Sequence, residues 1–243
     1  MIYLQLFLFI TSASWGTEIK LKDFNFSLPN IVNNGETSDS LFESMDREFV
    51  KTGSSICSNR AHMWANDFLR RSNIESGKIF MFYTPRNEDE ARTMWWYHVA
   101  PLVNENGFLW VLDAGFPRSL QRPVTVSEWF ESFSRSLTCK EIRKSEKDLV
   151  RLIFEGRVFP KVTNYGKHEC YYIITPYSYW TPRQIAMNFL GEDEEGAPIK
   201  FSRDSIDAED LYQACLEATT SKIGYALGSN VKKCQEYVSK QSL

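Results

Sequence analysis

The chain has 243 residues, of which 43% are hydrophobic and 14% aromatic, so it is long and apolar enough to bury a core. Its formal net charge is −3, which gives no broad basic field and argues against nucleic acid as the main partner. There is no sequence repeat and no low-complexity segment, and the mixture of helix-like and strand-like patterns favours α+β architecture.

The first 16 residues predict a secretory signal peptide. An apolar run, Ile2 to Ile10, is followed by small residues and is too short to cross a bilayer. The basic residue that usually precedes such a run is missing, and a buried N-terminal strand is the alternative. Cleavage would follow Ala13 or Gly16. We therefore expect a secreted or periplasmic protein without a membrane span.

Residues 17–50 predict a leader or short pro-segment, because they are mostly polar with scattered aromatic residues. This segment would either inhibit the protein or wrap around it as an arm. Toward its end Leu41, Met45 and Phe49 recur at helical spacing. The remainder, residues 51–243, predicts a single domain.

That domain begins with a predicted helix over residues 54–72. Ser54 and Ser55 are N-cap candidates, and Asn73 stands near the predicted end. An apolar stripe along this segment would face the core: Ala61, Trp64, Ala65 and Phe68.

Strand patterns and helix patterns follow in turn. Strands are predicted over residues 77–84, 95–103, 108–116 and 169–180, the last with a turn. Helices are predicted over residues 125–137, 207–227 and 230–240. The periodicity of residues 145–156 fits either a helix or a strand.

His98 lies inside the apolar run "WWYHVAPLV", and a buried imidazole requires a hydrogen-bond partner. Residues 104–107, "NENG", predict a turn. If Val103 pairs with Phe108 in an antiparallel hairpin, His98 lies opposite Asp113, within reach of a hydrogen bond. A slip of one residue would move Asp113 to the other face. The pair would be either a structural polar contact or part of a catalytic site.

Cys57 is the candidate nucleophile. At the start of a helix, free N–H groups and the helix dipole favour a thiolate and can stabilise an oxyanion. A thiolate beside an imidazole that a carboxylate orients is the general arrangement for attack on acyl carbons. The order Cys57, His98, Asp113 is that of papain-like and transglutaminase-like cores.

The five cysteines leave one thiol over in an exported protein. If Cys57 is the odd one, the other four allow three pairings. We favour Cys139–Cys170 and Cys215–Cys234, the second joining two C-terminal helices. No cysteine or histidine spacing suggests zinc.

The remaining polar candidates are weaker. His62 lies about 140° around the helix from Cys57, which favours a packing role. Arg60 either favours the thiolate or makes a salt bridge. His168 is expected at the surface.

Four short motifs, in this order, resemble the bacterial protein-glutaminases. They are "CSNRAHM" at 57–63, "YHVA" at 97–100, "VLDAGF" at 111–116 and "TVSEWFESFSRSLTC" at 125–139. The similarity covers residues 53–140. Ala114 stands where the family has a proline after its aspartate.

This resemblance implies an α+β, papain/transglutaminase-like core, in which an antiparallel sheet packs against the helix that carries Cys57 at its N-terminus. It implies a catalytic domain over residues 51–243 that deamidates glutamine side chains in proteins, giving glutamate and ammonia. Cys57 would be the nucleophile, His98 the acid and base, and Asp113 the orienting group, with no metal or cofactor. As substrate-binding residues we assign Ser55, Trp95, Trp96 and Tyr97, although aromatic residues in a strand are more often core.

We expect a monomer whose partners are proteins or peptides with exposed glutamine. The rival functions are a transglutaminase, which passes the same thioester to lysine, and a cysteine peptidase. A binding module without catalysis is a further alternative, against which the intact triad argues.

Overall fold

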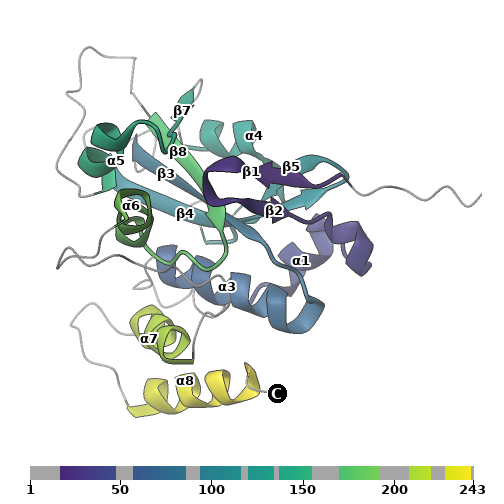
Figure 1. The fold of residues 1–243 in the computed structure, drawn as a ribbon. Helices are drawn as coiled ribbons and strands as arrows, with labels where there is room; N and C mark the ends of the chain where they lie inside the picture. Colours follow the sequence, from purple (N-terminus) through teal and green to yellow (C-terminus); the bar gives the residue numbers. More distant parts are fainter. Residues whose placement is uncertain are drawn as a thin grey trace, which may run out of the picture.

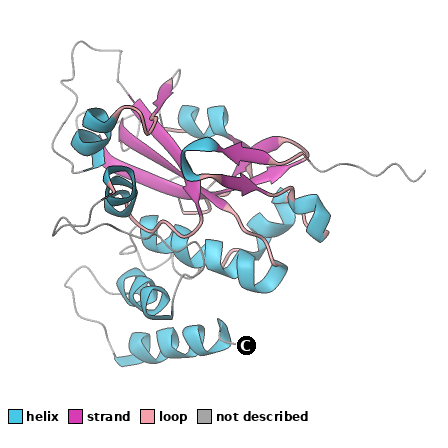
Figure 2. Ribbon diagram, in the orientation of Figure 1, coloured by secondary structure: helices cyan, strands magenta, loops and turns pink. Residues whose placement is uncertain are grey.

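The computed structural model describes residues 17–47, 57–85, 94–115, 120–133, 137–154, 170–191, 208–219 and 228–241. The predicted signal peptide, Ser55, Phe49 and His168 lie outside these residues. The described elements form a central sheet with helices on both sides (Figures 1 and 2). No described helix is long and apolar enough to span a bilayer.

The central sheet has six strands in the order β6-β5-β4-β3-β8-β7. The β7–β8 pair is parallel and the other pairs are antiparallel. The strands are β3 (Gly77–Pro85), β4 (Met94–Glu105), β5 (Phe108–Val111), β6 (Val124–Thr125), β7 (Cys139–Glu141) and β8 (Cys170–Pro176). The short β6 and β7 have no clear sequence pattern and were not predicted.

The predicted α+β class is confirmed. The helices are α1 (Ser38–Ser44), α3 (Cys57–Ser72), α4 (Val126–Glu131), α5 (Lys147–Phe154), α6 (Pro182–Leu190), α7 (Ala208–Thr219) and α8 (Gly228–Gln241). The ambiguous segment 145–156 therefore contains a helix. The α6 helix was not predicted, although Pro182 and the Thr181–Gln184 capping box mark its start.

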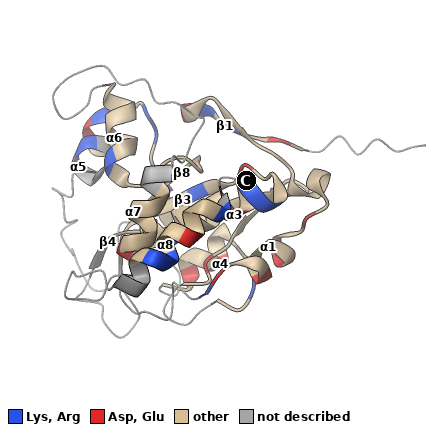
Figure 3. Ribbon diagram, turned by 90° about the horizontal axis from the view of Figure 1, so that it is seen from below, with Lys and Arg blue, Asp and Glu red and all other residues tan. Residues whose placement is uncertain are grey.

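Helix α3 places its apolar residues against the sheet. Ala61 packs with Phe80 and Val99, and its partners on the sheet are fully or almost fully buried. The helix ends before Asn73, whose φ of 52° is left-handed, a conformation asparagine tolerates at a helix end. Figure 1 shows α7 and α8 on the side of α3 that faces away from the sheet, and Figure 3 views the molecule from that side.

The opposite face of the sheet is covered by α4 and by a two-stranded hairpin, β1 (Ile19–Leu21) and β2 (Phe26–Leu28). Leu28 is fully buried in this layer beside Met81. Phe42 of α1 is buried in a separate cluster with Trp64 and Phe68 of α3. Residues 17–47, the described part of the predicted leader, thus contribute side chains to the core.

The predicted register of the β4–β5 hairpin is wrong by two residues. Val103 pairs with Trp110 rather than Phe108, because Asn106 and Gly107 alone form the turn. Both have positive φ, 55° and 89°, as a two-residue hairpin turn requires. Since side chains alternate with a period of two, a shift of two residues keeps every side chain on its predicted face.

Both predicted disulfides are confirmed. Cys139–Cys170 joins the parallel pair β7 and β8, and Cys215–Cys234 joins α7 to α8. Cys57 is the free cysteine of the described residues.

Candidate active site

Cys57 lies where the N-terminus of α3 meets an edge of β4 that no strand of the described residues pairs. The last paired residues of β4 and β5 are Leu102 and Val111, so β5 leaves the segment of β4 around His98. The thiol lies against this edge: its Sγ is 4.0 Å from the Tyr97 carbonyl oxygen, and the Val99 backbone N–H donates to it. The half-buried Cys57 therefore contacts backbone groups that a neighbouring strand would otherwise pair.

His98 connects the thiol to a buried carboxylate. Its Nε2 lies 2.8 Å from Asp113 Oδ2, and its ring also interacts with the thiol of Cys57, which raises the pKa of the imidazole. Both His98 and Asp113 are almost completely buried. The predicted contact between them is thus present, although Asp113 follows the end of β5 instead of lying directly opposite His98 in the ladder.

Trp129 of α4 is a residue of this cluster that the sequence reasoning missed. Its indole Nε1 donates to Asp113 Oδ2 at 2.9 Å, and its ring centroid lies 5.8 Å from that of His98. The Gly115 backbone N–H donates to Asp113 Oδ1 at 3.3 Å. A buried tryptophan requires an acceptor for its N–H, which was the available signal.

The three groups hold one another in charged forms. Burial alone would raise the pKa of the Cys57 thiol, but the hydrogen bond and charge of His98, with the charge of Arg60, lower it. Burial alone would lower the pKa of His98, yet the Asp113 carboxylate outweighs it and raises that pKa to about 9. Burial opposes ionisation of Asp113 as well, but His98 and Trp129 lower its pKa. The lowered pKa of Cys57 and the raised pKa of His98 both favour a thiolate–imidazolium pair.

Arg60 approaches this cluster from α3 and is buried. Its Nη2 donates to the Gly115 carbonyl oxygen at 3.5 Å, and its charge lowers the pKa values of Cys57 and Asp113. A Cβ on residue 115 would lie 2.5 Å from Arg60 Nε. Glycine at this position therefore makes room for the guanidinium.

The structure describes the side chains of two of the four predicted substrate-binding residues. Ser55 lies outside the described residues, and for Trp95 the structure describes only the backbone, in β4. Trp96 and Tyr97 are half-buried with ring centroids 5.1 Å apart. The Tyr97 hydroxyl donates to Ser58 Oγ at 3.2 Å, in the first turn of α3. Their role in substrate binding stays a prediction.

His62 is buried elsewhere, between α3 and the sheet. Its Nδ1 lies 2.8 Å from Nζ of the fully buried Lys78, which also donates to the Tyr179 carbonyl oxygen at 2.8 Å. Burial and the nearby Lys78 charge lower the pKa of His62 well below its ordinary value. This neutral, packed histidine fits the structural role that the sequence predicted.

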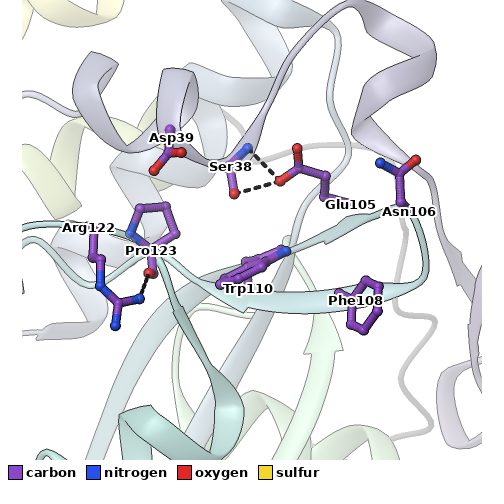
Figure 4. Close-up of a pocket in the computed structure, with 8 residues that line it drawn as sticks. All are labelled: Ser38, Asp39, Glu105, Asn106, Phe108, Trp110, Arg122 and Pro123. Carbon is purple, nitrogen blue, oxygen red and sulfur yellow. Dashed lines mark hydrogen bonds between the residues drawn. The ribbon is translucent and has the colours of Figure 1, made fainter.

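A surface pocket of about 370 Å³ lies at the other end of β4 (Figure 4). Its lining includes Glu105 and Trp110 but none of Cys57, His98 and Asp113. Glu105 is seven residues from His98 along the strand, about 23 Å at ~3.3 Å per residue. Across the described ranges, no group of three or more histidine, cysteine or acidic residues could hold a metal ion.

Residues 37–133 match a protein-family model described as glutaminase. This segment is similar to the glutaminase family. It contains Cys57, His98, Asp113 and Trp129, and the match confirms the resemblance seen in the sequence. Helices α7 and α8 lie beyond it.

The chain is also similar to solved protein-glutaminases. An NMR structure of protein-glutaminase from Chryseobacterium proteolyticum is 15% identical, covering 85% of this chain and 97% of the other, with a TM-score of 0.40. A crystal structure of protein-glutaminase is 14% identical, covering 77% and 90%, with a TM-score of 0.41. A crystal structure of pro-protein-glutaminase is 15% identical, covering 90% and 67%, with a TM-score of 0.39. No curated protein matches the chain.

Proposed function

We propose that this protein is a secreted protein-glutamine deamidase, which hydrolyses glutamine side-chain amides to glutamate and ammonia. One observation carries the proposal: a free, partly exposed cysteine at a helix N-terminus interacts with a histidine whose Nε2 lies 2.8 Å from a buried aspartate. The match of residues 37–133 to the glutaminase family supports an amide substrate.

In the first step the Cys57 thiolate attacks the carboxamide carbon of a glutamine. Backbone N–H groups in the first turn of α3 stabilise the oxyanion, since they have no partners within the helix. The His98 imidazolium then donates its proton to the departing nitrogen, and ammonia leaves. The product of this step is a thioester between Cys57 and the substrate side chain.

In the second step the now neutral His98 takes a proton from water, which attacks the thioester carbon. Collapse of the tetrahedral intermediate releases glutamate and restores the thiolate–imidazolium pair. Asp113 stays ionised throughout, because its role is to fix the ring and stabilise the imidazolium. Trp129 and Gly115 hold Asp113 by their N–H groups at 2.9 and 3.3 Å.

Secretion is part of the proposal. The two disulfides fit an oxidising compartment, and the signal-like residues 1–16 fit export. Mass spectrometry of the protein recovered from its producing cells would give the mature N-terminus. An intact Met1 on the exported protein would contradict the signal peptide.

The activity is tested with the protein lacking residues 1–16 and a glutamine-rich unfolded protein as substrate. Ammonia release, together with a mass increase of about 1 Da at glutamines and no new termini, is the expected result. Cys57→Ala should abolish it, whereas Ser44→Ala, a change in α1, should not.

Other reaction products would indicate a different activity. Cross-linked substrate would indicate a transglutaminase, and new termini would indicate a peptidase. If none of these appears, with or without limited proteolysis of the enzyme, the deamidase assignment is wrong.

A further inference from the structure

The C-terminal helices α7 and α8 pack tightly on α3. Ala214 and Cys215 of α7 and Cys234 of α8 are fully buried against Met63 and Ala65 of α3. The Cys215–Cys234 disulfide joins the two helices.

A polar contact adds to this packing. The Tyr237 hydroxyl donates to Asp67 Oδ1 at 2.8 Å, from α8 to α3. The position of α7 relative to the first turn of α3 is therefore fixed.

This packing places Glu217, two residues after Cys215, against the first turn of α3. The exposed Glu217 accepts a hydrogen bond from Asn59 Nδ2 at 3.1 Å. Asn59 is buried and is held from the other side, because its Oδ1 accepts from Trp180 Nε1 at 3.0 Å. The amide is thus oriented with its NH₂ group toward Glu217.

Tyr97 connects this carboxylate with the thiol. The phenol donates to Ser58 Oγ at 3.2 Å, and its pKa is raised to about 12 by burial and by the negative charges of Cys57 and Glu217. The tyrosine therefore lies within electrostatic range of both groups. Cys57 and Asn59 belong to the same first turn of α3, so the exposed charge of Glu217 lies within about one helical turn of the thiol-bearing residue.

We propose that Glu217 is a specificity-determining residue, whose charge favours glutamines flanked by lysine or arginine over glutamines flanked by acidic residues. The inference rests on the proposed function for its substrate class. At the small separations of neighbouring side chains, one exposed unit charge changes such a preference about three- to tenfold at low salt. The preference should nearly vanish in about 1 M salt, where the screening length is about 3 Å.

The test compares two peptides that differ only in having Lys or Glu on both sides of one glutamine. Glu217→Gln keeps an acceptor for Asn59 and removes the charge, and Glu43→Gln on α1 removes the same charge from an exposed position elsewhere. The ratio of kcat/KM for the Lys peptide to that for the Glu peptide should fall about three- to tenfold in Glu217→Gln. It should fall further in Glu217→Lys and stay unchanged in Glu43→Gln.

A ratio that does not respond to Glu217→Gln would overturn the inference and leave Glu217 as a structural partner of Asn59. The urea midpoint of each variant checks that the fold is kept. If Glu217→Gln does not fold, a folded Glu217→Lys protein tests the effect of the charge at position 217 instead.

A second readout does not need turnover. Cys57 is labelled with methanethiosulfonate reagents carrying either a trimethylammonium or a sulfonate group; the thiolate displaces methanesulfinate and forms a mixed disulfide. Glu217→Gln should lower the ratio of cation to anion labelling rates about threefold or more. If the wild-type protein releases no ammonia from either peptide, the proposed function fails, while an unchanged labelling ratio would separately reject the role of Glu217.

Discussion

The protein buries two histidines, His98 of β4 and His62 of α3, and gives them opposite neighbours. His98 contacts a carboxylate, and its pKa rises to about 9; His62 contacts the ammonium group of Lys78, and its pKa falls well below the ordinary value. Burial favours the neutral form in both places. The neighbouring charge decides whether a buried imidazole becomes an acid at neutral pH or a neutral packing group.

The two histidines also differ in the residues packed around them. Around His98, the edge of β4 that no described strand pairs receives the partly exposed Cys57. Around His62, the ring stacks on Trp180 with centroids 5.3 Å apart, and Lys78 is fully buried. Only the first arrangement places a nucleophile beside the ring.

The largest expected effect comes from Asp113→Asn, which removes the charge that distinguishes His98 from His62. His98 should then behave as a buried neutral histidine. We expect ammonia release to fall about 10³–10⁴-fold, by analogy with loss of the orienting aspartate in other triads. The alkylation rate of Cys57 as a function of pH should show the thiol titrating at a higher pKa.

Asp39→Asn, on the exposed side of α1, is the matched control for Asp113→Asn. If Asp113→Asn left the pH profile of Cys57 alkylation unchanged, the carboxylate would not control the thiolate.

Trp129→Phe tests the support of that carboxylate. The phenyl ring keeps most of the packing, but Asp113 loses a hydrogen bond of 2.9 Å to a charged acceptor, worth about 1.5–3 kcal/mol. Urea unfolding should show that the unfolding free energy falls by an amount in this range, and Cys57 alkylation should slow.

Trp64→Phe is the matched control, because Trp64 Nε1 donates at 2.9 Å to a neutral acceptor, the Asp46 carbonyl oxygen. Trp64→Phe should lower the unfolding free energy by about 0.5–1.5 kcal/mol and leave the alkylation rate of Cys57 unchanged. Equal losses in both variants would refute a special contribution from the charged acceptor.

His62→Gln tests how much His62 contributes to the pH dependence of the unfolding free energy. A folded pKa below the unfolded value means that the unfolded chain takes up a proton that the folded chain refuses as pH falls below about 6.5. Wild-type protein should therefore lose about 1–2 kcal/mol more unfolding free energy between pH 6.5 and 5 than His62→Gln. Denaturant titrations at both pH values measure the difference. Parallel losses in the two proteins would mean that His62 is protonated in the fold.

The smallest expected effect is that of Gly115→Ala. The added Cβ, 2.5 Å from Arg60 Nε, should push the guanidinium away and raise the pKa of Cys57 slightly, slowing its alkylation at neutral pH about two- to fivefold. In an Arg60→Met background the same substitution should have no further effect. A loss that persists there would place the cause in the backbone at residue 115.

Much of the candidate site was predictable from local sequence signals. The helix over 57–72, the strands around His98, and the odd cysteine follow from periodicity, cap residues and cysteine count. The contact of His98 with Asp113 was predicted from a register that proved two residues off. It survived because a shift of two preserves the face of every strand residue.

The sequence by itself determined which residue types the site contains and which face each occupies, since alternation and helical periodicity are local properties. Only the tertiary structure decided the partners that arrive from distant elements: Trp129 on Asp113, Lys78 on His62, and Glu217 on Asn59, the last 158 residues apart. It also decided that residues 17–47, polar in composition, contribute Leu28 and Phe42 to the core. These contacts depend on how the layers stack, which no short-range pattern specifies.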